Sequence, residues 1–224
     1  MNKECYEFFS NSFPIWDKLS EKERDLVLHQ SSLTEYGKGE NIHGNTGKCT
    51  GAVFVKSGVL RTYILSDEGK EITLYRLYPG DVCMLAASCV METITFDVFV
   101  DAEEKSEVCI INAAALTELT AKNVFIENYV LKLTSERFSE VMWAMQQILF
   151  MSFDRRLAVF LLAEIEKVGG DTIYLTQEQI AKYMVSAREV VSRMLKYFSQ
   201  EGLVEVSRGG VKVLDRERLR EIAG

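Results

Sequence analysis

One long segment without glycine or proline constrains the fold of this chain most. Residues 122–151, KNVFIENYVLKLTSERFSEVMWAMQQILFM, read as a single helix about 45 Å long. Mostly apolar side chains recur along it in alternating steps of three and four, which is typical of the a/d seam between paired helices. The seam consists of Leu131, Thr134, Phe138, Val141, Met145 and Ile148. A helix of this length is too long for one small domain to cover, so we expect a homodimer paired through this seam.

An alternative interpretation is a helix that packs on its own domain. Four further apolar side chains widen the stripe and favour this alternative: Leu133, Met142, Trp143 and Leu149. The sequence alone leaves both possibilities open.

The segment before this helix has the character of a β domain. A short amphipathic helix over 15–30, capped by Ser20, is followed from residue 31 to about 112 by runs rich in Val, Ile, Tyr, Phe and Thr. These runs, which include GAVFVKSGVLRTYIL, EITLYRLYPGD, ITFDVFV and SEVCII, are separated by turns at Gly58, Gly69 and Gly80. Their spacing predicts an antiparallel barrel or sandwich, and residues 113–120 predict one or two helical turns after it.

The C-terminal third predicts a helix-turn-helix with a wing. A helix over 154–167 ends at a pair of glycines, and LTQEQIAKYMVSAREVVSRMLKYFSQEGLVEVSRGGVKVLD follows over residues 175–215. Thr176 and Ser186 each stand where a capping residue begins a helix, with Gln179 and Glu189 at the capping-box positions. Gly202 ends the second helix, and 203–206 and 211–214 predict a hairpin with Arg208 at its tip. The second helix of this motif enters the major groove of DNA.

The second helix carries a polar face suited to base recognition. Arginine pairs well with guanine edges and glutamate accepts from cytosine N4; the face consists of Arg188, Glu189, Ser192, Arg193 and Lys196. The alternative is an ordinary solvated face with an ion pair between Glu189 and Arg193. The chain has a net charge of −7, but residues 171–224 carry +1 and the rest −8, which would orient the C-terminal end toward phosphates.

These motifs together make the whole chain resemble the Crp/Fnr family of bacterial regulators. The matching residues are LTQEQIAKYM-x-SARE-xx-SR-x-L and the VFVKSG-V-x(18)-YPGD framework. The resemblance implies an α+β protein with three parts: a jelly-roll-like β-roll sensor over 1–121, a dimerisation helix with a hinge near Ser152–Phe153 over 122–152, and a winged helix-turn-helix over 153–224. Val185 departs from the family, in which many members have glycine at this point of the turn.

The resemblance also implies the partners and the residues that contact DNA. Arg188, Glu189 and Arg193 would read base edges, with Ser192 assisting. The expected contact set is completed by Thr176, Gln177, Ser186, Lys196 and Arg208. The expected partners are a palindromic double-stranded promoter site, a second copy of the chain and RNA polymerase, and no membrane.

The sensor departs from the cyclic-nucleotide-binding members of the family. Met84-Leu85 stand where those relatives have Gly-Glu, and Phe96-Asp97 stand where they have an arginine followed by serine or threonine. Because Asp97 would repel a phosphodiester, we do not expect cyclic AMP to be the effector. The segment over 82–98 is the expected effector pocket, formed by Cys83, Met84, Leu85, Cys89, Phe96 and Asp97.

The effector itself stays open between two kinds of signal. Cys83 and Cys89 are close enough in sequence for a disulfide, which makes a thiol switch one possibility; buried inert thiols beside a pocket for an apolar effector are the other. All five cysteines are expected to be reduced in a cytoplasmic protein. Only Cys5 stands near the N-terminus, which disfavours an iron–sulfur cluster, and His29 and His43 are too few for a metal or haem site, so no cofactor is predicted.

Two other classes of protein compete with this interpretation. An enzyme is disfavoured because no G-x-S-x-G, H-E-x-x-H or P-loop motif occurs. A nucleotide-binding regulatory module that does not act on DNA would account for the β region but leaves the helix-turn-helix unexplained.

Overall fold

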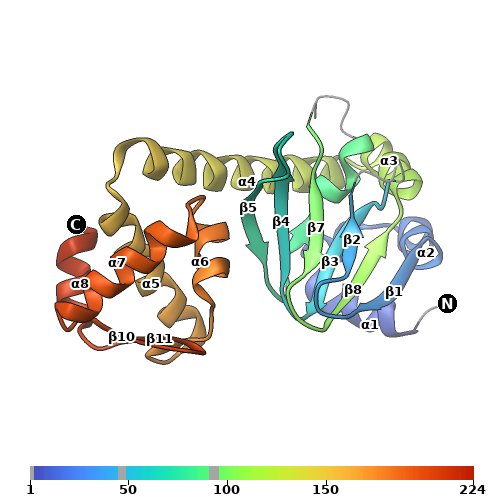
Figure 1. The fold of residues 1–224 in the computed structure, drawn as a ribbon. Coiled ribbons are helices and arrows are strands. Elements are labelled where there is room, and N and C mark those ends of the chain that lie inside the picture. Colours follow the sequence, from blue (N-terminus) through green and yellow to red (C-terminus); the bar gives the residue numbers. More distant parts are fainter. Residues whose placement is uncertain (1–2, 45–48, 91–95) are drawn as a thin grey trace. The chain divides into compact units, whose positions relative to one another are not determined.

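A computed structural model describes residues 3–44, 49–90 and 96–224 of the chain (Figure 1). The chain forms two compact units, of which one comprises residues 1–70 and 74–140 and the other residues 71–73 and 141–224.

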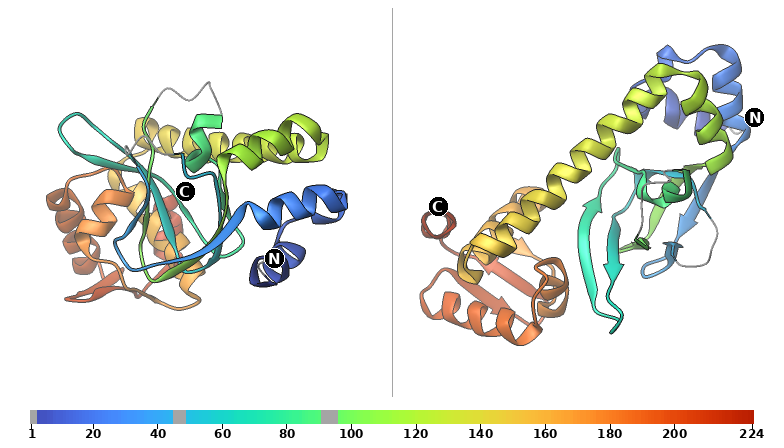
Figure 2. Two further views of the ribbon diagram at one scale, coloured as in Figure 1. Left: turned by 90° about the vertical axis from the view of Figure 1, so that its right-hand side faces the viewer. Right: turned by 90° about the horizontal axis from the view of Figure 1, so that it is seen from above.

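The N-terminal unit is built on two four-stranded antiparallel sheets, with strand orders β1-β8-β3-β6 and β2-β7-β4-β5. Seen from the end, the sheets curve around a common interior (Figure 2, left). This arrangement confirms the predicted antiparallel β domain. The strands are β1 (Ser31–Tyr36), β2 (Asn41–His43), β3 (Ala52–Ser57), β4 (Leu60–Leu65), β5 (Glu71–Leu77), β6 (Val82–Cys83), β7 (Phe99–Ala102) and β8 (Ser106–Ile111), and the short helix η2 (Leu85–Val90) follows β6.

Strand β3 is buried on both faces. Phe54 pairs with Cys109 of β8, and Val53 pairs with Cys83 of β6. The side of β3 that bears Phe54 packs against an aromatic cluster from the N-terminal helices, in which the Phe54 ring meets the Phe9 ring edge-on at 5.2 Å between centroids. The opposite side faces the second sheet, so β3 reads as a continuous apolar run rather than an alternating one.

Three N-terminal helical segments cover the first sheet: α1 (Lys3–Ser12), η1 (Trp16–Lys18) and α2 (Glu21–His29). The sequence predicts α2 but not α1. The predicted cap at Ser20 is confirmed, because its hydroxyl accepts from the Glu23 amide while the Glu23 carboxylate accepts from the Ser20 amide at 2.7 Å. Phe9 and Phe13 of the α1 region are buried and supply the aromatic contacts with Phe54.

The predicted helix over 122–151 has a different start. Helix α3 (Ala113–Lys122) ends one residue before α4 (Val124–Phe150) begins, and Asn123 between them is extended. The Asn123 side chain accepts from the Phe125 amide at 2.9 Å and donates to Glu23 at 2.9 Å. Asn123 therefore ends one helix and starts the next, which a pattern of apolar spacing does not reveal.

Helix α4 leaves most of its predicted seam uncovered by the single chain. Leu131 is 57% exposed and Phe138 66% exposed, and Met145 and Ile148 are exposed as well. Thr134 is also exposed and Val141 is half-buried. The stripe is wider than two positions per heptad, since Met142, Trp143 and Leu149 are exposed too. None of the helices in the described ranges is both long and apolar enough to cross a membrane.

The C-terminal unit is a small helical domain with a three-stranded sheet of order β10-β11-β9. Its core is formed by Leu157 and Leu161 of α5, Ile180 of α6, and Leu195 and Phe198 of α7, all fully buried. The elements are α5 (Phe153–Val168), β9 (Thr172–Ile173), α6 (Gln177–Tyr183), α7 (Arg188–Gln200), β10 (Val204–Ser207), β11 (Gly210–Val213) and α8 (Arg216–Ala223).

Candidate nucleic-acid interface

The helix-turn-helix begins at Thr176, as predicted. The Thr176 hydroxyl accepts from the Gln179 amide at 3.2 Å, and the Gln179 side chain accepts from the Thr176 amide at 2.9 Å. This reciprocal capping box satisfies two backbone donors that a helix start leaves unpaired. The box fixes the point at which the chain enters α6.

The turn between α6 and α7 is strained. Val185 has a φ of +50°, a region that β-branched residues seldom occupy. The Ser186 amide donates to the Ala181 carbonyl at 3.0 Å, closing the end of α6. This bond makes Ser186 part of the turn that ends α6. The predicted cap at Ser186 is therefore wrong, and Ala187 precedes α7 without a side-chain cap.

Arg156 of α5 stabilises this turn, a role that the sequence did not indicate. Its guanidinium donates to the Met184 carbonyl at 3.2 Å, on the last residue before Val185. The same group lies over the Phe153 ring at 5.3 Å, and burial lowers the pKa of Arg156. The contact joins residues 28 positions apart, so no local spacing could have indicated it.

Helix α7 has two distinct faces. Val191, Leu195 and Phe198 are buried in the core of the unit. The opposite face is polar, with Arg188, Glu189, Arg193 and Lys196 exposed and Ser192 half-buried. The predicted recognition face is thus presented to solvent along one side of the helix.

The hairpin of β10 and β11 places Arg208 near the start of both helices. A side chain at Gly210 would bring a Cβ within 2.3 Å of the Ile173 carbonyl oxygen, so glycine is required for β11 to approach β9. A groove of about 380 Å³ lies between the hairpin and the helix starts. It brings together four of the predicted contact residues, Thr176, Gln177, Arg188 and Arg208, along with Leu175, Glu178, Val206, Ser207, Gly210 and Val211.

The exposed basic side chains of α8 differ from those of α7 and the hairpin in their ion pairs. Arg216, Arg218 and Arg220 form ion pairs with Asp171, Glu201 and Glu217. Within the described residues, no ion pair involves the predicted contact residues Arg188, Arg193, Lys196 and Arg208. Positive charge without a carboxylate partner is therefore exposed on α7 and the hairpin, where it can attract the phosphates of a nucleic acid.

The predicted effector residues differ in burial. Cys83 and Met84 are buried in the N-terminal unit and Leu85 is half-buried, whereas Phe96 is 52% exposed and Asp97 is exposed. Phe96 and Asp97 are therefore accessible to water, whereas Cys83 and Met84 belong to the interior.

The cysteines differ in state. Cys83 is a free, fully buried thiol whose Sγ lies 3.8 Å from the Thr62 hydroxyl, and burial raises the pKa of Cys83. A thiol in this environment behaves as a small apolar side chain rather than as a nucleophile. The side chain of Cys89 lies outside the described residues. Cys49 is disulfide-bonded, so the expectation of five reduced thiols is wrong at that position.

His43 is a buried histidine bonded to a neighbouring side chain. The His43 ring bonds the Thr50 hydroxyl at 2.9 Å, and burial lowers the pKa of His43. Among the side chains that the structure describes, no three of His, Cys, Asp or Glu are grouped so as to hold a metal ion.

Known proteins match this chain along most of its length. Residues 33–123 match the family of cyclic nucleotide-binding domains, and residues 155–222 match the family of Crp-like helix-turn-helix domains. The transcriptional activator protein anr of Pseudomonas aeruginosa is 30% identical over 196 residues, covering 84% of this chain and 78% of that protein. The cyclic AMP receptor protein of Thermus thermophilus is 24% identical, covering 94% of this chain and 96% of that protein.

A solved structure of a Crp/Fnr-family transcriptional regulator from Eubacterium rectale is also similar. It is 44% identical, with a TM-score of 0.90, and the match covers 95% of this chain and 99% of that one. The helix-turn-helix geometry, the β domain and these matches agree: the chain belongs to the Crp/Fnr family of DNA-binding transcription regulators.

Proposed function

We propose that two copies of this chain bind one twofold-symmetric DNA site, each placing α7 in a major groove. The observation that carries the proposal is the row of cationic side chains on α7 and the hairpin that form no ion pair within the described residues. Arg188, Arg193 and Glu189 would read base edges, with Ser192 assisting. Arg208 and Lys196 would hold phosphates on either side of the groove. The bound complex would act on transcription together with RNA polymerase.

The uncovered apolar stripe of α4 supports pairing of two copies. Phe138 is 66% exposed and Leu131 57% exposed, and the stripe continues through Met145 and Leu149. Helix α4 is about 40 Å long by its rise per residue, which allows several turns of continuous contact. A soluble monomer seldom exposes so long a contiguous apolar surface. With two α7 helices related by a twofold axis, the half-sites would lie about one helical turn, roughly 34 Å, apart.

An effector other than cyclic AMP would gate this binding. Met84 is buried where cyclic-nucleotide-binding relatives have glycine, and Asp97 is a carboxylate where they have a small hydroxyl side chain. Neither residue can hold a phosphodiester. Thiol gating through Cys83 is the weaker form of the proposal, because that thiol is free, buried and of raised pKa.

Selection of binding sites from random duplexes, with purified full-length protein at one fixed salt concentration, tests the proposal. The selection is run in reducing and in oxidising buffer, and with and without cyclic AMP. A twofold-symmetric motif that is recovered equally with and without cyclic AMP is expected. Binding without any sequence preference in every condition would mean either that the protein needs the missing effector or that α7 does not read DNA. Recovery only with cyclic AMP would refute the assignment of the effector.

A further inference from the structure

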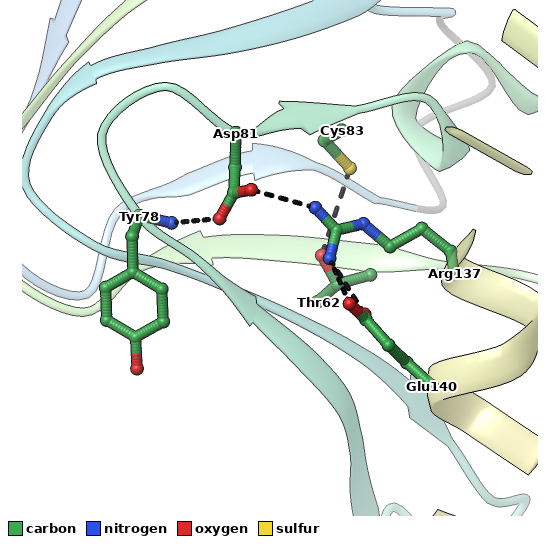
Figure 3. A network of polar contacts seen from close by, with 6 residues as sticks. All are labelled: Thr62, Tyr78, Asp81, Cys83, Arg137 and Glu140. Carbon is green, nitrogen blue, oxygen red and sulfur yellow. Dashed lines mark hydrogen bonds and ion pairs between the residues drawn. The ribbon is translucent and has the colours of Figure 1, made fainter. Parts of the chain in front are cut away.

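A single arginine joins α4 to the turn between β5 and β6 within the N-terminal unit (Figure 3). Arg137 donates to Asp81 Oδ1 at 3.1 Å, and its guanidinium lies over the Tyr75 ring at 5.0 Å. The Arg137 side chain is only 16% exposed. A cation with so little access to water is stable only while carboxylates face it.

The carboxylate that receives Arg137 is held in a rigid turn. Asp81 Oδ2 accepts from the Tyr78 amide at 2.9 Å, and the Asp81 amide donates to the Tyr78 carbonyl at 2.9 Å. Gly80 between them has a φ of +95°, and its amide donates to Val55 of β3 at 2.9 Å. Both oxygens of Asp81 are therefore engaged, one by the turn and one by α4.

Arg137 has a second partner on its own helix. Its Nη1 donates to the two carboxylate oxygens of Glu140 at 2.9 and 2.8 Å, as Figure 3 shows. If the turn moved and the bond to Asp81 broke, the guanidinium would keep a carboxylate and would not become an unpaired buried charge. The Arg137 Nε is buried and has no hydrogen-bond partner in the described part of the chain. Because Glu140 stays bound to Arg137 in either case, the closed and open states of the Asp81 contact differ by one ion pair. The free energy between the two states is then small enough for the contact to break and re-form.

The two ends of the contact lie beside the two places where regulation would act. Asp81 is two residues before Cys83, which is fully buried and lies against Thr62 of the facing sheet. Arg137 is next to Phe138, the most exposed of the apolar residues in the predicted seam. A shift of β6 or its turn would thus reach the proposed dimer surface through one side chain.

We propose that the Asp81–Arg137 ion pair is a latch that couples the interior of the β domain to the position of α4. This inference rests on the proposed function, because the position of α4 matters only if α4 pairs with a second copy that carries the other α7. Arg137 acts as a positioning residue and contacts neither DNA nor effector.

A double-mutant cycle tests the latch in the full-length protein. Asp81→Asn keeps an acceptor for the Tyr78 amide but removes the charge, Arg137→Gln removes the cation, and the double variant removes both. Glu140→Gln is the matched control, because it removes the partner on the helix and leaves Asp81 bound. The affinity for the selected DNA site, the mass in solution and the hydrogen exchange of the amides in residues 131–141 are measured for each variant.

If the ion pair is a latch, either single variant should change the dissociation constant for the selected DNA site at least fivefold. Either should also speed amide exchange in residues 131–141, while the mass of the protein in solution stays unchanged. The double variant should be no further from the wild type than a single one, and Glu140→Gln should stay within twofold. An Asp81→Asn protein with wild-type affinity and wild-type exchange, or effects of the two substitutions that simply add, would overturn the inference. If the wild type itself bound no specific site, the proposed function would fail, and the exchange measurement would still decide whether the latch exists.

Discussion

Replacement of Arg193 by alanine is the sharpest test of how α7 reads DNA. Arg193 is exposed on the polar face of α7 and forms no ion pair in the described structure, so binding a base does not require an existing contact to break. A good bidentate contact to a base discriminates by about 1–3 kcal/mol. A symmetric dimer loses two such contacts, or about 2 kcal/mol at the low end, and this corresponds to roughly 30-fold weaker specific binding.

The same substitution should leave the fold almost unchanged. Arg193 covers no part of the core, whereas the neighbouring Leu195 is fully buried. Surface substitutions of this kind usually change the free energy of unfolding by no more than about 0.5 kcal/mol. Loss of binding at an unchanged melting temperature therefore separates base reading from stability.

The assay is fluorescence anisotropy with the selected duplex and a scrambled duplex of equal length, at one salt concentration. Arg193→Ala should lose affinity for the selected duplex and keep most of its affinity for the scrambled one. Arg216→Ala is the matched control, since it removes the same charge from an exposed side chain of α8 that is already paired with Asp171. An Arg193→Ala protein that still prefers the selected duplex as strongly as the wild type would refute the assignment of Arg193.

Three further outcomes are expected. Phe138→Arg should give a monomer by light scattering, because Phe138 belongs to the exposed apolar stripe of α4. The control Glu136→Arg, on the opposite side of α4, should stay dimeric. A dimeric Phe138→Arg protein would disprove pairing through this stripe. Cys83 should react with iodoacetamide far more slowly in the folded protein than in urea, since burial raises the pKa of its thiol. Fast labelling of the native protein would instead support gating by the Cys83 thiol. Burial raises the pKa of Glu23, but hydrogen bonds from Ser20 and Asn123 outweigh it and hold this pKa below 4.5. Glu23 therefore stabilises the fold above pH 4.5 and loses this effect as the pH falls through its lowered pKa. The stability difference between wild type and Glu23→Gln, followed by urea unfolding, should shrink over that range, and a difference independent of pH would contradict it.

Local sequence patterns predicted those elements whose signals lie within a few residues. The capping residues Ser20 and Thr176 each have their partner three positions along the chain, and the structure confirms both. The polar face of α7 follows from helical periodicity in the same way. The cap predicted at Ser186 is wrong because Val185 adopts a left-handed conformation and the Ser186 amide bonds back to α6, which places Ser186 in the turn.

Long-range contacts were beyond those patterns. Arg137 meets Asp81 across 56 residues and Asn123 meets Glu23 across 100, and neither pair has a signal in local spacing. The exposure of Phe96 and the burial of Cys83 depend likewise on how the two sheets close, although both residues lie in one short segment.

The sequence by itself determined the order of the parts, the antiparallel β domain, the long helix and the helix-turn-helix, because hydrophobic period, caps and glycine positions act over a few residues. Tertiary structure alone decided which of several charges are free and which are compensated. It paired Arg216 with Asp171 and Arg218 with Glu201, left Arg188 and Arg193 open to a ligand, and enclosed Arg137 against Asp81. The physical reason is that the electrostatic energy of a charged side chain depends on its distance from other charges and on its access to water. Folding sets both.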